Sequence, residues 1–140
     1  MLQNVFIVKK DSNELIFYGQ LTDDPVEDLE TVLGQIIMKA VNQSPGATNI
    51  MALNQGKFVY GVFQKFYMIL HLEKGTSKTK ATELVEKLAS VFKKKYNRQL
   101  LQYGGDNSIF GGFSKDIQEA LAQKEDKKPE NVPKPTPKPS

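Results

Sequence analysis

The chain has 140 residues, of which 39% are hydrophobic and 25% are charged, and its formal net charge is +3. This apolar content supports one hydrophobic core, so we expect a single domain. The absence of cysteine excludes disulfides and thiolate metal sites, and the sequence has neither a secretory signal nor an apolar run of transmembrane length. We therefore expect a small cytoplasmic protein.

The first part of the chain predicts a β-hairpin followed by a helix. Apolar runs at residues 5–8 and 15–18 flank a polar turn at 11–13. The sequence Asp24-Pro25-Val26-Glu27 has a capping residue, a proline at the first helical position and a glutamate three residues after the cap. Apolar residues then recur at helical spacing, so we expect a helix over residues 26–42.

Three strands and two further helices are expected in the rest of the folded part. Apolar runs bounded by turn-forming residues predict strands at 48–53, 57–63 and 66–72. Apolar residues at helical spacing predict helices at 78–97 and 113–122. We expect one core to hold residues from two of these strands and from the first of these helices: Phe58, Val62, Leu70, Leu84, Leu88 and Phe92.

The order of predicted elements is β-β-α-β-β-β-α-α. Because the strands are apolar on both faces, we expect an α+β fold in which helices flank a five-stranded, mostly antiparallel sheet over residues 1–123. Residues 124–140 contain five prolines and a single branched aliphatic residue, Val132. This segment is predicted to be a disordered Lys/Pro-rich tail, acting as a linker or as a ligand for proline-binding grooves.

No residue pattern in the sequence supports catalysis or cofactor binding. The single histidine, His71, lies in an apolar strand, and no serine occupies a nucleophile-elbow pattern. The acids at 23–30 lack the spacing and central glycine of a calcium loop, and residues 74–79 lack the Gly-Lys-Ser/Thr order of a phosphate loop. We therefore predict a protein without catalytic residues, metal or cofactor.

Most of the excess positive charge lies outside the predicted domain. Residues 124–140 carry five lysines and three acids, a net charge of +2, which leaves +1 for residues 1–123. Lys93, Lys94, Lys95 and Arg98 lie near the end of a predicted helix, where the helix dipole favours cations. This charge is too small to indicate nucleic-acid binding. The lysines form either a solvated helix face or a contact with an anionic membrane or an acidic partner.

The pattern of apolar and aromatic residues resembles that of longin domains, which are small profilin-like α/β modules. Within that family it is most similar to the amino-terminal longin domain of the signal recognition particle receptor alpha subunit, and it is also similar to adaptor sigma subunits. The resemblance extends over about residues 3–123. It rests on the segment Phe58-Val-Tyr-Gly-Val-Phe-Gln-Lys65 and on Leu70, Leu84, Val85, Leu88, Phe92, Lys95, Tyr96, Phe110, Phe113 and Leu121.

The resemblance implies a non-catalytic interaction module of the membrane-trafficking or protein-targeting type. Longin domains bind small GTPases, hold SNARE segments or pair with another longin or roadblock domain. No GTPase domain, SNARE helix or membrane anchor follows the longin-like part, so we expect a free-standing subunit that binds a small GTPase or a longin/roadblock-type subunit. A homodimer and peripheral association with an anionic membrane are further expectations.

Two alternatives belong to other classes. One is a homodimeric roadblock-like regulator of small GTPases, although the roadblock fold starts with a helix and this chain is predicted to start with a hairpin. The other, with less support, is a small enzyme built on a profilin-like sheet.

The helix predicted at 26–42 has more apolar surface than one sheet face needs, and Gly34 would let another backbone approach it closely. In longin domains, the surface beside this helix and the third strand corresponds in position to a groove used for pairing. The alternative is that the same residues only fill the domain's own core. We predict that the partner binds residues of this helix and of the third strand: Leu33, Gly34, Ile37, Met38, Val41, Ile50 and Ala52.

Overall fold

The structure is a computed structural model that describes residues 2–22, 26–53, 56–105 and 107–126. It consists of two compact units, Met1–Phe110 and Gly111–Ser140. Within the described residues, the first unit has the element order β1-β2-α1-β3-β4-β5-α2-η1, where η1 is a short 3-10 helix, and the second unit contains α3. The predicted order of strands and α-helices is therefore confirmed.

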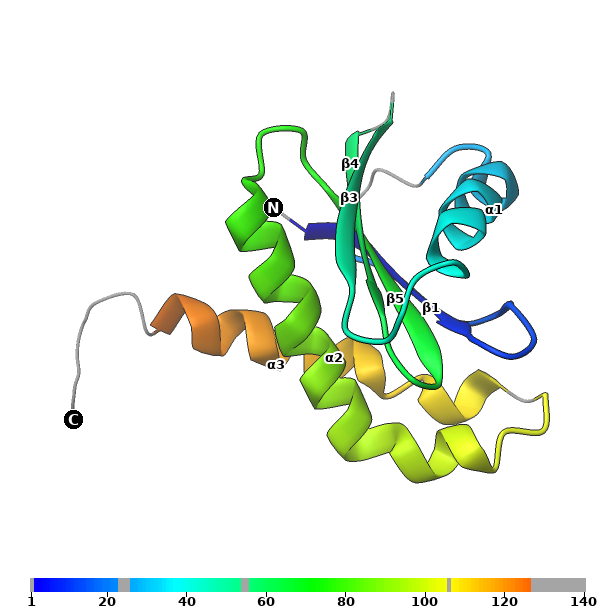
Figure 1. The fold of residues 1–140 in the computed structure, drawn as a ribbon. Coiled ribbons are helices and arrows are strands. Elements are labelled where there is room, and N and C mark those ends of the chain that lie inside the picture. The colour runs from blue at the N-terminus through cyan, green and yellow to red at the C-terminus, as the bar shows by residue number, and fades with distance from the viewer. Residues whose placement is uncertain (1, 23–25, 54–55, 106, 127–140) are drawn as a thin grey trace. The chain divides into compact units, whose positions relative to one another are not determined.

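The five strands form one sheet in which every neighbouring pair is antiparallel (Figure 1). Their order across the sheet is β2-β1-β5-β4-β3. The strands β4 and β5 are buried along nearly their whole length, which explains why their sequences are continuous apolar runs instead of alternating ones. From β1 to β5 the bounds are Leu2–Lys9, Glu14–Gln20, Thr48–Leu53, Gly56–Val62 and Phe66–Leu72.

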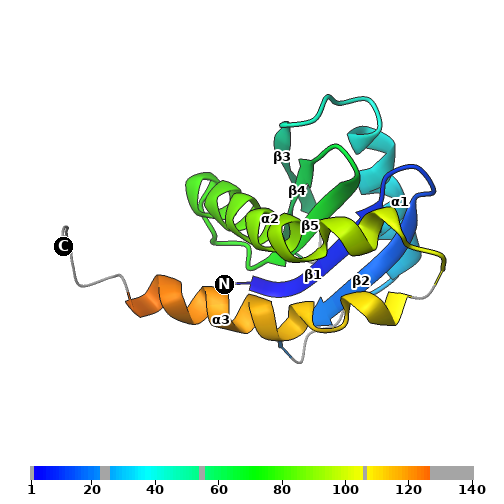
Figure 2. The same ribbon diagram turned by 90° about the horizontal axis from the view of Figure 1, so that it is seen from below.

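The helices α1 (Leu29–Ala40) and α2 (Lys78–Leu101) cover opposite faces of the sheet (Figures 1 and 2). Successive side chains of a strand point to opposite faces, so each central strand contributes to two layers of packing. In β4, Phe58 packs in the α1 layer, whereas a Cβ atom placed on Gly61 would lie 3.3 Å from Val85 of α2. The predicted α+β fold with helices on both faces is confirmed.

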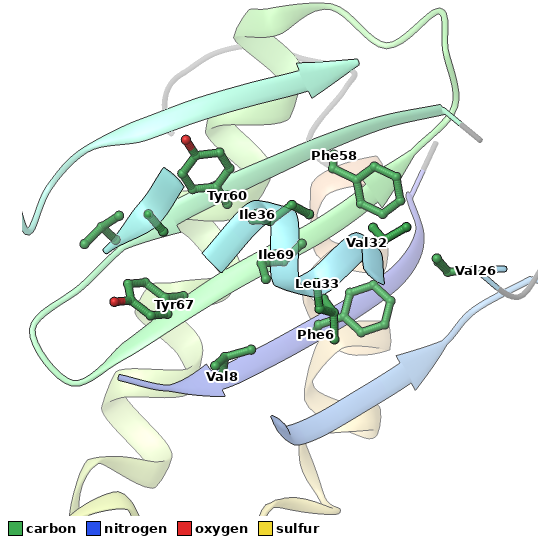
Figure 3. Packing of buried hydrophobic residues seen from close by; sticks show 12 residues of the cluster. Phe6, Val8, Val26, Val32, Leu33, Ile36, Phe58, Tyr60, Tyr67 and Ile69 are labelled. Carbon is green, nitrogen blue, oxygen red and sulfur yellow. The ribbon is translucent and has the colours of Figure 1, made fainter. Parts of the chain in front are cut away.

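The layer between α1 and the sheet is a cluster of buried side chains (Figure 3). The helix places its side chains at intervals of three or four residues toward the sheet, as an amphipathic helix does. Its contribution is Val32, Leu33, Ile36 and Ala40. The other buried members come from β1, β4, β5 and the segment before α1: Phe6, Val8, Val26, Phe58, Tyr60, Val62, Tyr67 and Ile69.

The layer between α2 and the sheet has an aromatic centre. The ring centroid of Phe92 lies 5.0 Å from that of Phe66 in β5, 5.3 Å from that of Tyr96 and 5.7 Å from that of Phe110. Edge-to-face and offset arrangements at these distances are favourable for aromatic rings. Phe110 ends η1 (Asn107–Phe110), so the aromatic contacts hold this short helix against α2.

The prediction that six apolar residues share one core is wrong. Phe58 and Val62 lie in the α1 layer, whereas Leu84, Leu88 and Phe92 are buried residues of α2, on the other side of the sheet. Leu70 pairs with Val59, whose side chain alternates with that of Phe58, so Leu70 also faces α2. The sheet therefore separates two cores that the hydrophobic pattern alone does not distinguish.

The helix boundaries differ from the predicted ones. α1 begins at Leu29, because Asp28 has a left-handed backbone (φ +56°) and makes no side-chain cap, so residues 26–28 are not helical. Asp24 and Pro25 of the predicted capping box lie outside the described residues. α2 starts as expected, with the Ser77 hydroxyl accepting a hydrogen bond from the Lys80 backbone amide. It continues to Leu101, four residues beyond the predicted end.

The second unit contains the helix α3, Phe113–Asp126, which confirms the predicted helix at 113–122 and extends it by four residues. The predicted tail at 124–140 thus overlaps the end of this helix, and residues 127–140 lie outside the described residues. Among the described residues, no helix has both the length and the apolar character needed to cross a bilayer.

Candidate interaction surface

The strand β3 is an open edge of the sheet. Its sequence, Thr-Asn-Ile-Met-Ala-Leu, contains no charge and no proline, which are the usual features that protect an edge strand from pairing. The opposite edge, β2, is partly covered, because η1 contacts it and the Tyr103 hydroxyl donates a 2.6 Å hydrogen bond to the Glu14 carboxylate. β3 is also contacted by α2, but that helix covers a face of the sheet and not its edge. Among the described residues, β3 is therefore the less covered of the two edges.

The register of β3 shows which backbone groups face outward. The amide of Val62 donates to the carbonyl of Ala47, and antiparallel pairs alternate between bonded and non-bonded residues. Continuing along the register, Asn49, Met51 and Leu53 bond to β4, so the amides and carbonyls of Thr48, Ile50 and Ala52 point to the open edge. An extended segment of another chain could bond to these three residues.

The C-terminal end of α1 comes shortly before β3 in the sequence, and the segment between them is hydrogen-bonded to β3 and β4. The Gln43 side-chain amide donates a 3.1 Å hydrogen bond to the Tyr60 hydroxyl of β4, and its carbonyl oxygen accepts from Asn49 of β3. The last turns of α1 expose two large apolar side chains, Met38 at 73% and Val41 just after the helix at 50% exposure. These side chains are available to a partner.

The structure divides the predicted site residues into three groups. Leu33 is a core residue at 8% exposure and Ile37 is half-buried against the same core, so the core-filling alternative holds for these two. Met38 and Val41 are exposed. Ile50 is half-buried and Ala52 exposed, and because Met51 packs in the α1 layer, both point toward the α2 side of the sheet.

The predicted residues therefore do not form one continuous side-chain surface. What α1 and β3 have in common is their position around the open edge, with the α1 residues on one side of the sheet and Ile50 and Ala52 on the other. The feature that the sequence analysis missed is the outward-facing backbone of β3, which becomes visible only from the strand order.

Gly34 is half-buried on α1, and a Cβ atom placed there would meet no heavy atom within 4 Å. The packing of this chain thus does not need a glycine at this position. We expect Gly34→Ala to raise the free energy of unfolding by about 0.5–1 kcal/mol, because alanine favours the helix and restricts the unfolded chain. Urea denaturation measures the change. A loss of stability would mean that the backbone at Gly34 lies closer to other atoms than the structure indicates.

No arrangement for catalysis is found among the described residues. His71 is 2% exposed, its Nδ1 lies 3.0 Å from Asn4 Nδ2, and its ring stacks on Phe58 with a centroid distance of 4.6 Å. These are the contacts of a structural histidine inside a core. In the part of the chain that the structure describes, no three acids or histidines are grouped as metal ligands. Residues 73–77 connect β5 to α2, and Ser77 caps the helix.

Comparisons with known proteins identify a structural neighbour. No family model matches the sequence, and no curated protein matches it. Among solved structures, a chain from "The Structure of the Mammalian SRP Receptor" superposes with a TM-score of 0.52 and 17% identity, covering 90% of this chain and 96% of that one. The two chains therefore share a fold, and the longin-like fold that the sequence predicted is the fold of this chain.

Proposed function

We propose that this chain is a non-catalytic interaction module of the protein-targeting type, and that it captures a protein partner along the open edge of β3 and the exposed end of α1. The observation that carries the proposal is the uncharged edge strand β3, which pairs with no second strand among the described residues, beside a helix end that exposes Met38 and Val41. The likeness of the fold to the SRP receptor chain supports the targeting role.

The partner that fits this surface is a folded protein that offers a strand edge and an apolar patch. Main-chain hydrogen bonds to Thr48, Ile50 and Ala52 would each contribute about 0.5–1.5 kcal/mol, and side chains on either side of the edge would supply specificity. The longin resemblance makes a small GTPase and a longin or roadblock-type subunit the candidate partners. The hairpin at the start of this chain, with β1 and β2 paired, favours the longin reading over a roadblock-like regulator.

We further propose a cytoplasmic location, where such partners act, and peripheral association with a membrane. The proposal assigns no catalytic role, since His71 is occupied by core contacts.

The edge can be blocked without disturbing the fold by Ala52→Pro. Proline at this position removes an amide that points outward and keeps the bonds of Met51 and Leu53 to β4, and edge strands tolerate proline there. Ala52→Val is the matched control, because it keeps the amide and adds a side chain suited to a strand. We expect Ala52→Pro to abolish partner capture and Ala52→Val to keep it.

The measurement is a pull-down with the purified full chain, followed by identification of bound proteins and by sedimentation analysis of self-association. A small GTPase or a longin-type subunit that is lost with Ala52→Pro, and weakened by Met38→Asp with Val41→Asp, would support the proposal. Thr31→Asp, an exposed change near the start of α1, is the control for the helix. Capture that survives both Ala52→Pro and the double aspartate variant would refute it.

A further inference from the structure

A group of lysines from three separate parts of the sequence gathers at one end of the first unit. Two hollows flank the β4–β5 turn and share Gln64 and Lys65 in their lining. One, of about 290 Å³, is lined also by Lys9 and Lys10 of the β1–β2 hairpin. The other, of about 510 Å³, is lined also by Lys93 of α2. We call these four lysines the basic end.

Two of these lysines have fixed positions. The Lys10 amide donates to the Lys65 carbonyl, and the Lys10 ammonium donates a 3.2 Å hydrogen bond to the Phe63 carbonyl, which joins the two turns. The Lys93 ammonium lies 5.4 Å from the centroid of the Phe63 ring, which itself stacks on Phe66 at 4.9 Å. A cation over an aromatic face is held in place electrostatically. The positive charges are thus positioned by the fold.

The basic end has an uncompensated charge. Its hollows are lined by four lysines and one acid, Asp11, which gives a net charge of +3. The hydrogen bond from Lys9 lowers the pKa of the Asp11 carboxyl, so Asp11 stays ionised and offsets Lys9. Among the described residues, neither Lys65 nor Lys93 forms an ion pair. Lys10, Lys65 and Lys93 therefore remain as three positive charges facing solvent or a ligand.

The helix dipole does not account for this arrangement. Its effect is limited to the last turn of a helix, whereas Lys93 lies two turns before the end of α2 at Leu101. Lys10 and Lys65 belong to strand turns and have no helix terminus to complement. The charges converge because three segments far apart in sequence meet at this end.

The basic end also carries an exposed apolar side chain. Leu101 is 63% exposed and lines the same hollow as Lys9, Lys10 and Lys65. A soluble anion, or a peptide segment of acidic residues alone, matches the lysines but leaves Leu101 in water. A bilayer with anionic headgroups matches both, because phosphate and carboxylate groups lie beside the apolar boundary of the acyl chains.

We propose that the basic end docks on the surface of an anionic phospholipid bilayer. Lys10, Lys65 and Lys93 contact the headgroups, and Leu101 enters the boundary between headgroups and acyl chains. The binding is reversible, because a few lysines and one leucine give far less affinity than a membrane-spanning segment. This inference rests on the peripheral membrane association proposed above and names the surface that makes it. It does not depend on the capture of a protein partner, since the basic end shares no residue with the proposed partner site.

The test is co-sedimentation of the full chain with vesicles of phosphatidylserine mixed into phosphatidylcholine, compared with vesicles of phosphatidylcholine alone. We expect binding only to the mixed vesicles, and it should weaken as salt is raised because the attraction is screened. Each lysine near such a surface strengthens binding roughly fivefold, so the double variant Lys65→Gln with Lys93→Gln should bind roughly 25-fold more weakly.

The matched control is the double variant Lys78→Gln with Lys80→Gln, which removes the same charge from exposed positions at the start of α2. It should bind the mixed vesicles as the unmodified chain does. Leu101→Ser should weaken binding and leave the slope of the salt dependence unchanged.

Three results would overturn the proposal. One is an equal loss with the Lys78 and Lys80 variant, which would mean that only the total charge matters. Another is the absence of binding to the mixed vesicles. The third is full competition by soluble glycerophosphoserine with no effect of Leu101→Ser, which would mean that the basic end binds a free anion and not a bilayer.

Discussion

Phe92→Ala is expected to lower the free energy of unfolding by about 3–5 kcal/mol, the largest effect we predict for a single side chain. Phe92 is fully buried, and its ring lies against Phe66, Tyr96 and Phe110. The substitution removes these contacts and leaves a cavity that the rigid sheet on one side cannot fill. Urea or guanidinium denaturation of the full chain measures the shift of the midpoint.

Lys94→Ala is the matched control for this prediction, because Lys94 is the exposed residue two positions later on the same helix. It should change stability by no more than about 0.5 kcal/mol. If Phe92→Ala cost less than about 1 kcal/mol, α2 would not be packed on the sheet through this aromatic centre, and the layer on that side of the sheet would have to be reassigned.

The types and order of the elements could be predicted because each has a local pattern. β5 was predicted with its observed bounds, because turn-forming residues limit its apolar run on both sides. The start of α2 was predicted because Ser77 has a specific capping contact. The end of α2 was not, because Leu100 continues the buried stripe beyond the lysine-rich turn, at 3% exposure.

The predicted start of α1, at residue 26, is wrong, since the helix begins at Leu29. Val26 is buried in the α1 layer at 8% exposure, so it continues the apolar pattern of the helix without being helical. The left-handed backbone at Asp28 separates it from the helix. A capping-box sequence and apolar spacing favour a helix, and local backbone conformation can override both.

The order of the strands in the sheet could not be predicted from the sequence. The pair of β1 with β5 joins residues that are 57 or more positions apart, such as Val5 and Leu70, and no local signal encodes it. This pairing places β3 at the edge and decides which faces are covered. The candidate site therefore could be predicted only in part: Met38 and Val41 are exposed as the surplus on α1 suggested, whereas Leu33 is a core residue.

The basic end also could not be predicted from the sequence. In the sequence, its lysines lie far apart, in two turns and one helix, and no local pattern links them: Lys9, Lys10, Lys65 and Lys93. The pairing of β1 with β5 and the hydrogen bonds of Lys10 to Phe63 and Lys65 bring the two turns together, and α2 adds Lys93. Counting charges along the sequence identified the lysines of the helix, Lys93 among them, but did not identify Lys9, Lys10 and Lys65.

Gly56→Ala is expected to lower the free energy of unfolding by about 2–5 kcal/mol, because backbone strain and steric crowding would both act on the new side chain. Gly56 begins β4 with a φ of +139°, which side chains of L-residues rarely adopt. A Cβ atom there would lie 2.7 Å from the Leu72 carbonyl oxygen and 3.0 Å from Nε2 of His71.

Neither neighbour of Gly56 can move away at low cost. Leu72 pairs with Lys57 across β4 and β5 and with Leu2 of β1, so its carbonyl is held inside the sheet. The His71 ring is stacked on Phe58 and contacts Asn4. Equilibrium denaturation of Gly56→Ala beside Gly34→Ala makes a matched comparison, because both add one methyl group to a glycine. Gly34→Ala adds the methyl group to open space and should raise the free energy of unfolding. Gly56→Ala adds it against the backbone and should lower the free energy of unfolding. Equal shifts in the two variants would show that the tight approach of β4 to β5 at Gly56 does not exist in solution.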